Sequence, residues 1–219
     1  MTICIFAKEP VPGKVKTRLA ATVGAATATR LATAFLKDTL SLVHTVDVPT
    51  VIAWSGAFES APRGIEVWAQ GEGDLGERIE RMFLRALSRS PWVIALGADS
   101  PGLPPEYLRA AVEALRTHDA VIGPADDGGY YLLGVSRCEP ALLADIAWSA
   151  PSTRAQTVDR LLARGYDVAT VGAWFDVDDA NDLARLTRLL REGALRAEET
   201  ARELGIDPSR DTLRTKSDE

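Results

Sequence analysis

The 219-residue sequence predicts an α/β protein, a single-domain α/β/α sandwich on a mostly parallel, mixed sheet. Three observations predict this class. Short apolar runs rich in β-formers alternate with longer segments of helical spacing, as in parallel strands connected by helices. Apolar residues make up 46% of the chain, enough for a sizeable core. A Gly-rich turn between two closely spaced apolar runs indicates one antiparallel strand.

The predicted strands are short apolar runs that end at Gly, Pro or charged residues. The first, "TICIFA" at 2–7, ends at a lysine and a loop with two prolines, and is typical of a buried strand. "DDGG" joins two later runs and is a strong hairpin-turn signal, so one strand of that pair is expected to be antiparallel. The further strands are expected at 50–54, 65–70, 92–98, 119–125, 130–135 and 167–171.

The predicted helices carry apolar side chains three or four residues apart. Residues 24–43 show this spacing from Leu31 to Val43, and Pro105 and Glu106 suit the start of another helix. Beyond about residue 192 the chain is charged and loses the strand pattern, so we expect a terminal helix and a disordered tail at 192–219, after one domain at 1–191. The other helices are expected at about 75–87, 154–164 and 179–192.

The charge of the chain argues against a nucleic-acid partner. There are 25 Lys and Arg against 31 Asp and Glu, a net charge of −6, whereas binding to nucleic acid needs a basic face. The apolar run at the N-terminus is too short for a membrane span and lacks the charged start of a signal peptide, so a cytoplasmic protein without a membrane partner is expected. The oligomeric state is open, a homodimer included.

The segment "FAKEPVPGKVKTRL" places Lys14, Lys16 and Arg18 within five positions, directly after the first predicted strand. Ligands of open parallel sheets bind where strands end. Gly13 allows close backbone approach, and Thr17 adds a hydroxyl, so a polyphosphate fits this loop. The spacing matches neither the P-loop nor the dinucleotide fingerprint. A solvated basic loop is the alternative.

Acidic residues in two distant segments are candidate metal ligands. Asp99 follows a buried-type strand in "LGADSPGLP", where one carboxylate suits Mg²⁺ with its water and phosphate ligands; a helix cap is the alternative. In "WFDVDDANDL", alternation puts Asp176 and Asp178 on one face. Asp179 is expected to cap the following helix, with Asp182 near its N-terminus.

Three further segments are candidate binding sites. In "GPADDGGYYLLG", two acids precede two glycines and two tyrosines, which is more than a hairpin turn needs, although a turn is the alternative. "QGEGDLGER" is a flexible loop ahead of a helix whose N-terminus could face a phosphate; an ordinary strand–helix connection is the alternative. Trp148 and Ser149 could contact an acceptor or simply line a helix contact.

Together, the segments "FAKEPVPGKVKTRL", "GEGDLGER", "GADSPGLP", "GPADDGGYYLLG", "AWSAPST" and "FDVDDANDL" resemble a group of bacterial transferases. That group has the nucleotide-diphospho-sugar transferase (GT-A) fold, a Rossmann-like α/β/α sandwich. It is often labelled glycosyltransferase, with some members near radical-SAM or arsenosugar genes. The chain is more distantly similar to 2-phospho-L-lactate guanylyltransferase and molybdenum cofactor guanylyltransferase. The resemblance covers about residues 2–190.

The resemblance implies a nucleotide held by the first loop, a divalent metal (Mg²⁺ or Mn²⁺) held by acids, and a small-molecule acceptor near the "DGGY" segment. With the residue patterns above, the expected nucleotide-binding residues are Ala7, Lys8, Gly13, Lys14, Lys16, Thr17, Arg18, Gly73, Asp74 and Ala98. The expected metal ligands are Asp99, Asp178 and Asp176. The expected acceptor-binding residues are Asp126, Asp127, Gly128, Gly129, Tyr130, Trp148 and Ser149. Lys16, Arg18, Asp99 and Asp127 are the expected catalytic residues.

The leading hypothesis is a metal-dependent nucleotidyltransferase that moves NMP from an NTP to a phosphorylated or phosphonate metabolite and releases pyrophosphate. Glycosyltransferases of this fold commonly carry Asp-x-Asp, whereas this chain has Asp99-Ser100-Pro101, with one acid. The basic loop also suits a triphosphate. A glycosyltransferase that uses an NDP-sugar is the alternative, with Asp126 or Asp127 near an acceptor hydroxyl. A non-catalytic nucleotide-binding protein is the third possibility.

Overall fold

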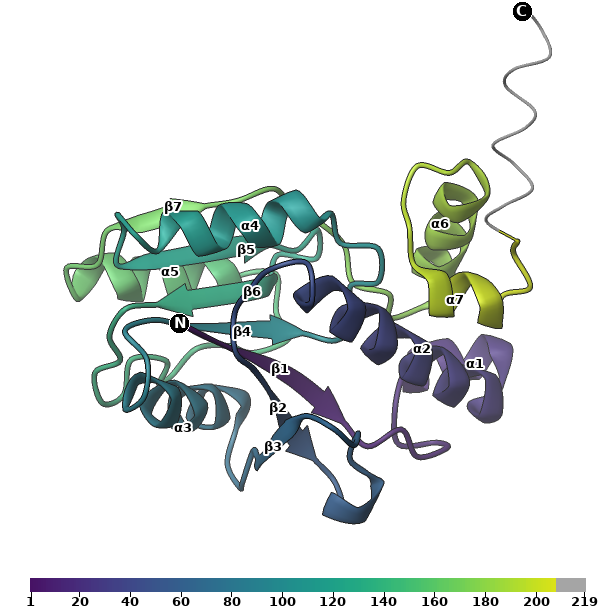
Figure 1. Cartoon of the computed structure of the whole chain (residues 1–219), viewed down its shortest axis with the longest axis horizontal. Helices are drawn as coiled ribbons and strands as arrows, with labels where there is room; N and C mark the ends of the chain where they lie inside the picture. Colours follow the sequence, from purple (N-terminus) through teal and green to yellow (C-terminus); the bar gives the residue numbers. More distant parts are fainter. Residues whose placement is uncertain (208–219) are drawn as a thin grey trace, which may run out of the picture. The chain divides into compact units, whose positions relative to one another are not determined.

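The computed structural model describes residues 1–207 and contains one mixed sheet. Its seven strands lie in the order β3-β2-β1-β4-β6-β5-β7 (Figure 1). All neighbours are parallel except β6, which runs antiparallel to β4 and to β5. The strands are β1 (Thr2–Lys8), β2 (Thr50–Ser55), β3 (Glu66–Ala69), β4 (Val93–Gly97), β5 (Ala120–Pro124), β6 (Tyr130–Val135) and β7 (Val168–Thr170). The mostly parallel sheet and the antiparallel hairpin strand are therefore confirmed.

The chain forms two compact units, each built from three stretches of sequence. The first comprises Met1–Glu9, Val43–Gly97 and Pro105–Phe175; it contains the whole sheet with α3 (Leu75–Leu87), α4 (Pro105–Ala114), α5 (Thr153–Ala163) and the short 3₁₀ helix η1 (Phe58–Ser60). The second comprises Pro10–Leu42, Ala98–Pro104 and the chain from Asp176 onward. Its helices are α1 (Thr17–Val23), α2 (Ala25–Val43, whose last residue belongs to the first unit), α6 (Ala180–Arg191) and α7 (Glu198–Glu203).

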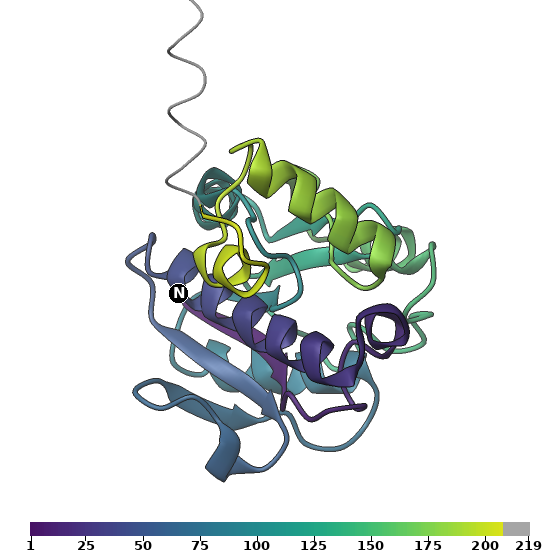
Figure 2. The same ribbon diagram turned by 90° about the vertical axis from the view of Figure 1, so that its right-hand side faces the viewer.

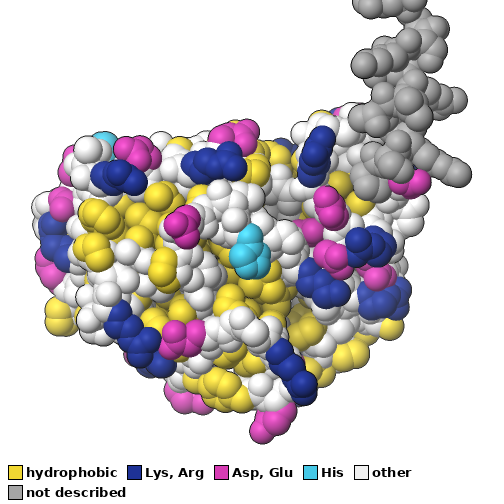
Figure 3. Space-filling model, viewed as in Figure 1, with side chains coloured by type: hydrophobic (Ala, Val, Ile, Leu, Met, Phe, Trp, Pro, Cys, Tyr) yellow, Lys and Arg dark blue, Asp and Glu magenta, His cyan; other side chains and the backbone are white. Residues whose placement is uncertain are grey.

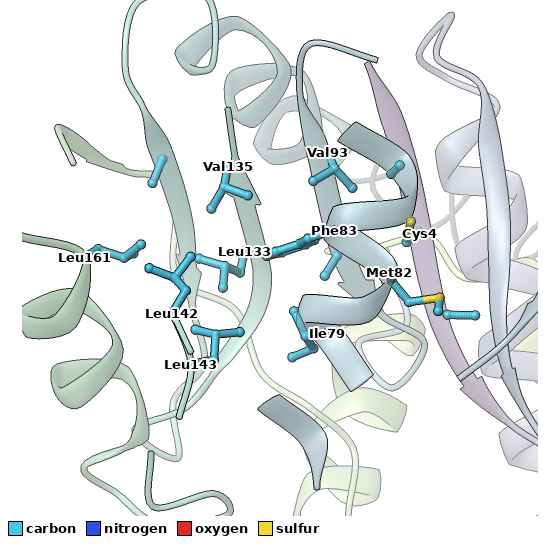
Figure 4. Close-up of a cluster of buried hydrophobic side chains, with 14 of the residues drawn as sticks. Cys4, Ile79, Met82, Phe83, Val93, Leu133, Val135, Leu142, Leu143 and Leu161 are labelled. Atoms are coloured by element: carbon cyan, nitrogen blue, oxygen red, sulfur yellow. The ribbon is translucent and has the colours of Figure 1, made fainter. Parts of the chain in front are cut away.

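Helices pack on both faces of the sheet within the first unit. On one face, Phe83 of α3 and Leu161 of α5 join a buried cluster with Leu133 of β6 and Cys4 of β1 (Figure 4). On the other face, the segment that follows α4 packs against β6, because a side chain at Gly134 would meet Leu115 at 2.8 Å. The α/β class with helices on both faces of the sheet is thus confirmed.

The basic segment near the N-terminus differs from its prediction as a loop, because helix α1 begins at Thr17 and includes Arg18. Residues 17–23, "TRLAATV", contain good helix formers, and Leu19 is fully buried. The helix begins after Lys16 without a side-chain cap and ends at Val23, and its C-cap Gly24 has a φ of 84°. A helix that begins without Ser, Thr, Asp or Asn at its N-cap lacks the sequence signal by which a helix start is usually predicted. Helix η1 was likewise not expected.

The expected terminal helix is α7, and residues 208–219 of the expected tail lie outside the described residues. Figure 2 shows α7 beside α2 within the second unit. Over these helices, basic and acidic side chains intermingle at the surface (Figure 3), and ion pairs join Arg30 to Glu203 at 2.6 Å and Lys37 to Glu199 at 3.4 Å. No helix within residues 1–207 is both long and apolar enough to cross a membrane.

Asp38 of α2 supplies the N-terminal cap of α7 across 162 residues of sequence. Its carboxylate accepts hydrogen bonds from the backbone N–H groups of Glu199 (2.9 Å) and Thr200 (3.0 Å), and from the Thr200 hydroxyl (2.5 Å). Ala197, at the N-cap position itself, has no side chain that could do this. Because Asp38 is only 9% exposed, these bonds form away from water. A long-range carboxylate therefore anchors the last described helix.

We predict that Asp38→Ala lowers the free energy of unfolding by about 1.5–3 kcal/mol, because three bonds to a buried charged acceptor are lost. At this chain length the melting temperature should fall by roughly 3–12 °C. Hydrogen exchange should show faster exchange at the amides of Glu199 and Thr200. The exposed Asp47→Ala is the control and should leave both readouts unchanged. Wild-type melting and exchange in the Asp38 variant would contradict this role.

Candidate active site

A buried lysine of the second unit joins two acids from distant segments of sequence. The Nζ atom of Lys16 lies 2.9 Å from Oδ1 of Asp99 and 2.9 Å from Oδ1 of Asp178. Arg18 reaches the other oxygen of Asp178, with Nη2 at 2.5 Å from Oδ2. The Lys16 side chain is only 6% exposed, whereas that of Arg18 is 69% exposed. Four of the predicted site residues thus form one cluster of two cations and two anions.

The backbone of Lys16 is in the left-handed conformation, with φ 45° and ψ 48°. This conformation costs a residue other than Gly about 1–2 kcal/mol. Lys16 lies at the N-cap of α1, and its carbonyl accepts from Ala20 N–H at 2.7 Å. Its Nζ lies 5.9 Å from the centre of the Phe35 ring. Backbone strain at a residue of a charge cluster is typical of functional sites.

Two backbone segments that carry the acids are tied together. The carbonyl of Asp99 accepts from Val177 N–H at 2.9 Å. Next to it, the hydroxyl of Ser100 donates to Oδ1 of Asp176, and Ser100 is only 4% exposed. Asp176 and Asp178 therefore have different partners, since Asp176 binds Ser100 while Asp178 binds the two cations. Ser100 was not singled out in the sequence, where a serine after an acid carries no specific signal.

The acids at the start of α6 cap that helix, as expected. The carboxylate of Asp179 accepts from the N–H groups of Asn181 (2.8 Å) and Asp182 (3.1 Å). In return, Asp182 Oδ2 accepts from the N–H groups of Asp178 (3.0 Å) and Asp179 (3.1 Å). This reciprocal arrangement is a capping box. Because it holds the backbone of Asp178, it also fixes the carboxylate that meets Lys16 and Arg18.

The charges of the cluster stabilise one another against burial. Burial alone would lower the pKa of the Lys16 ammonium, but Asp99 and Asp178 outweigh burial and raise it. Burial alone would raise the pKa of Asp178, but Lys16 and Arg18 outweigh burial and hold it below its usual range. For Asp176, burial dominates and raises the pKa to about 6, although the Ser100 hydrogen bond opposes it. The shifts of Lys16 and Asp178 therefore both favour the charged forms of these two groups.

The two carboxylates have the chemistry that a magnesium ion requires. Mg²⁺ takes oxygen ligands and is usually held by one or two carboxylates, with water and substrate phosphates completing the set. Asp99 and Asp178 point to one common position, and Asp99 is 55% exposed. Within residues 1–207 no three His, Cys, Asp or Glu side chains gather as a metal cage. The residues fit a metal shared with a ligand, at a position where the Lys16 ammonium lies.

Within the first unit, Trp148 lies against the first turn of α3. A side chain at Gly76 would come within 3.0 Å of the Trp148 ring and 2.7 Å of the Leu143 carbonyl, so only glycine fits. Asp74 caps this helix: its side chain accepts from Glu77 N–H at 2.9 Å. Gly73 precedes it with φ 104°. The indole N–H of Trp148 is buried without a hydrogen-bond partner among the described residues, which is uncommon for a buried donor.

The "DDGG" segment forms the β5–β6 hairpin turn. Gly128 has φ 89°, and a side chain there would lie 2.2 Å from the Pro151 carbonyl oxygen, so the turn packs closely on the segment that follows Trp148 and Ser149. One oxygen of Asp127 accepts from Gly129 N–H at 2.8 Å, as in an Asx turn. The rings of Tyr130 and Trp148 meet edge to face, 6.3 Å apart. The predicted acceptor-binding residues near Gly128 and Trp148 are thus neighbours.

Other predicted nucleotide-binding residues occupy strand ends and turns. Ala7 is buried in β1 and Lys8 is the exposed last residue of that strand, while Ala98 is buried. Gly13 has φ 76° in the turn where Lys14 N–H donates to the Val11 carbonyl at 2.9 Å.

Sequence reasoning also missed Gln70, which follows β3 and is only 6% exposed. Its amide donates to the carbonyls of Ala7 (3.1 Å) and Ala53 (2.8 Å), so it joins the ends of β1 and β2. Its position at the end of a predicted strand was the available signal.

The described residues form an α/β fold, and its candidate site combines two cations with two carboxylates. Residues 22–150 match the family described as "Uncharacterized protein conserved in bacteria (DUF2064)", and the chain belongs to this family. No protein of curated function matches the chain.

Several solved structures are similar to the chain. A "putative nucleotide-diphospho-sugar transferase" from Desulfovibrio desulfuricans G20 is 32% identical with a TM-score of 0.84, over 93% of each chain. CMP:2-keto-3-deoxy-manno-octonic acid synthetase, solved with CTP, is 14% identical with a TM-score of 0.55, over 88% of this chain and 98% of its own. Rv0371c from Mycobacterium tuberculosis H37Rv, solved with manganese, is 15% identical with a TM-score of 0.50, over 84% and 97%. These likenesses confirm the nucleotide-diphospho-sugar transferase fold, and nucleotide transfer fits it.

We predict that Ser100→Ala lowers the free energy of unfolding by about 1–3 kcal/mol, because the buried Asp176 carboxyl loses its hydroxyl donor. Chemical denaturation at neutral pH measures this loss. Ser60→Ala is a matched control, since the Ser60 hydroxyl donates to the Ala57 carbonyl at an exposed site; it should cost less than about 0.5 kcal/mol. Equal stability of the two variants would show that the Ser100 bond does not hold the segments together.

Proposed function

We propose that this chain is a divalent-metal-dependent nucleotidyltransferase, which transfers NMP from an NTP to a phosphorylated or phosphonate small metabolite. The cluster of Lys16, Arg18, Asp99 and Asp178 is the observation that carries this proposal. It combines two cations for phosphate oxygens with two carboxylates for a metal ion, on a fold shared with a CTP-bound synthetase. Phosphoryl and nucleotidyl transfer depend on this combination of positioning and charge stabilisation.

In the proposed reaction, an oxygen of the acceptor phosphate attacks the α-phosphorus of the NTP. The bond from the α-phosphorus to the oxygen that bridges to the β-phosphorus breaks, and pyrophosphate leaves with that electron pair. Lys16 and Arg18 neutralise the charge that grows on the leaving group, Arg18 with its bidentate fork. Asp99 and Asp178, with Asp176 beside them, would hold Mg²⁺ or Mn²⁺, which withdraws electron density from the phosphate oxygens. An ionised acceptor phosphate needs no general base.

The nucleotide is proposed to bind to residues of the basic segment and of the loop before α3: Ala7, Lys8, Gly13, Lys14, Lys16, Thr17, Arg18, Gly73, Asp74 and Ala98. The edge-to-face contact of the Tyr130 and Trp148 rings, 6.3 Å apart, supports a common role for these two residues. The proposed acceptor-binding residues are Asp126, Asp127, Gly128, Gly129, Tyr130, Trp148 and Ser149.

A glycosyltransferase that uses an NDP-sugar is the second candidate, favoured by the description of the Desulfovibrio desulfuricans protein. A neutral hydroxyl acceptor would make a general base useful. Asp127 would have to serve with one of its oxygens already bonded to Gly129 N–H. The single acid in Asp99-Ser100-Pro101 and the two cations beside Asp178 favour nucleotidyl transfer instead.

We predict that one NTP stabilises the protein only with Mg²⁺ or Mn²⁺, and that Asp99→Asn abolishes this effect. A ligand at a concentration of a hundred times its dissociation constant adds about 2.7 kcal/mol to the free energy of unfolding. This corresponds to a rise of several degrees in the melting temperature. Thermal unfolding with a panel of NTPs and NDP-sugars measures it, and the exposed Asp159→Asn serves as the control.

The outcomes separate the candidates. Pyrophosphate released from the stabilising NTP, in the presence of phosphorylated acceptors, would establish nucleotidyl transfer. Stabilisation by an NDP-sugar, with activity lost in Asp127→Asn, would favour the glycosyltransferase. Binding without turnover that survives Asp99→Asn would indicate a non-catalytic nucleotide-binding protein. No stabilisation by any member of the panel would contradict a metal-nucleotide site.

A further inference from the structure

We propose that Lys16 is a resident cation of the metal site, which binds Asp99 and Asp178 until a polyphosphate draws it away. This inference rests on the proposed metal site and adds a mode of regulation to it. Metal binding and phosphate binding would then be coupled through one side chain. A divalent ion alone would bind weakly, and the two ligands together would bind strongly.

The position of the ammonium is the first argument. Its Nζ is equidistant from one oxygen of Asp99 and one of Asp178, at 2.9 Å from each. A metal ion held by these same two oxygens would occupy the same region, at shorter distances. Two cations cannot share that region without strong repulsion. Metal entry at these oxygens therefore requires Lys16 to move.

The charge of the cluster is the second argument. Asp99 and Asp178 contribute two negative charges, and Lys16 and Arg18 contribute two positive charges. Both oxygens of Asp178 have a cationic partner. These four side chains together carry no net charge, so a lone divalent ion is attracted less strongly than it would be by Asp99 and Asp178 without the two cations. The burial of Lys16 strengthens this arrangement, since water screens its ion pairs less than those between two exposed side chains.

The backbone of Lys16 is the third argument. Its left-handed conformation is unfavourable for a residue with a side chain. The two ion pairs of Nζ help to offset this cost. The ammonium can leave the cluster by rotation about the bonds of its side chain, without a change in the backbone of Lys16. Lysine suits such a switch because its ammonium is a compact charge on a flexible four-carbon stem.

A polyphosphate can provide the negative charge that draws Lys16 away from the two carboxylates. Its negative oxygens can take both Lys16 and the exposed Arg18, which leaves Asp99 and Asp178 with two uncompensated negative charges for the metal. Coupling of this kind is reciprocal and typically changes affinity by 5- to 150-fold. Metal binding should therefore depend on whether the Lys16 charge is present, even without a nucleotide.

The test measures Mn²⁺ binding to the full-length protein without nucleotide, from the electron paramagnetic resonance signal of free Mn²⁺. Lys16→Met, which keeps an unbranched apolar stem, should bind Mn²⁺ at least tenfold more tightly than the wild type. Arg18→Met, at an exposed position that folding tolerates, should bind it a few-fold more tightly. Lys37→Met removes a charge elsewhere in the same unit, where Lys37 pairs with Glu199, and should match the wild type.

The double variant Lys16→Met/Asp99→Asn tests whether the tighter Mn²⁺ binding takes place at Asp99. We expect this variant to lose the increase in Mn²⁺ affinity that Lys16→Met alone shows. Equal Mn²⁺ affinity in the wild type, Lys16→Met and Arg18→Met would overturn the proposal, as would a gain that persists without the Asp99 charge. Should Lys16→Met fail to fold, Arg18→Met alone decides, because both cations neutralise Asp178. These binding measurements do not depend on turnover, so they test the resident-cation role separately from nucleotidyl transfer. If the enzyme is catalytically active but its variants bind Mn²⁺ no more tightly than the wild type, only the resident-cation proposal is refuted.

Discussion

The ion pairs of Lys16 with Asp99 and Asp178 are the interaction on which the candidate site depends. The lysine lies 162 residues from Asp178 in sequence, and the three side chains come from the three stretches that make up the second unit. Removal of one partner would leave a buried or half-buried charge uncompensated, which is far more costly than the loss of an exposed ion pair. The same charges that arrange these segments are those that a metal and a phosphate require.

The supporting contacts around this interaction restrict where the acids can lie. The Asp182 carboxylate holds the Asp178 backbone, and the Ser100 hydroxyl and the Asp99 carbonyl tie residues 99–100 to residues 176–177. Such fixed carboxylates suit a metal ion that demands near-ideal geometry. The left-handed backbone at Lys16 is the strained element within this set. The proposed exchange of Lys16 for a metal ion would therefore need no large movement of the acids.

Much of the fold could be predicted from local patterns, because alternating apolar runs and helical spacing depend on near neighbours in sequence. The hairpin at "DDGG" and helix α3 match their predicted ranges closely. Helix α1 could not be predicted as readily, since it begins at a lysine in a left-handed conformation. The cap that Asp38 gives to α7 spans 162 residues, and no local pattern contains it.

The candidate site, too, could be predicted from the sequence only in part. Lys16, Asp99 and Asp178 could be selected individually, from charge clustering and from positions after strands. Their mutual pairing could not, because the sequence suggested phosphate as the partner of Lys16, whereas the structure places two carboxylates there. Ser100 and Gln70 were missed because their roles come from contacts with segments far along the chain. The acceptor-binding residues stay a prediction.

The most direct measurement is a ¹H–¹⁵N correlation spectrum of the lysine ammonium groups at neutral pH, with and without Asp99→Asn. Exposed ammonium protons exchange too fast with water to be seen, whereas a buried, doubly paired ammonium exchanges slowly. We predict one protected signal that disappears in Lys16→Arg, and that weakens or shifts in Asp99→Asn. A wild-type spectrum without any protected ammonium, or a protected signal that Asp99→Asn leaves unchanged, would contradict the central place given to Lys16.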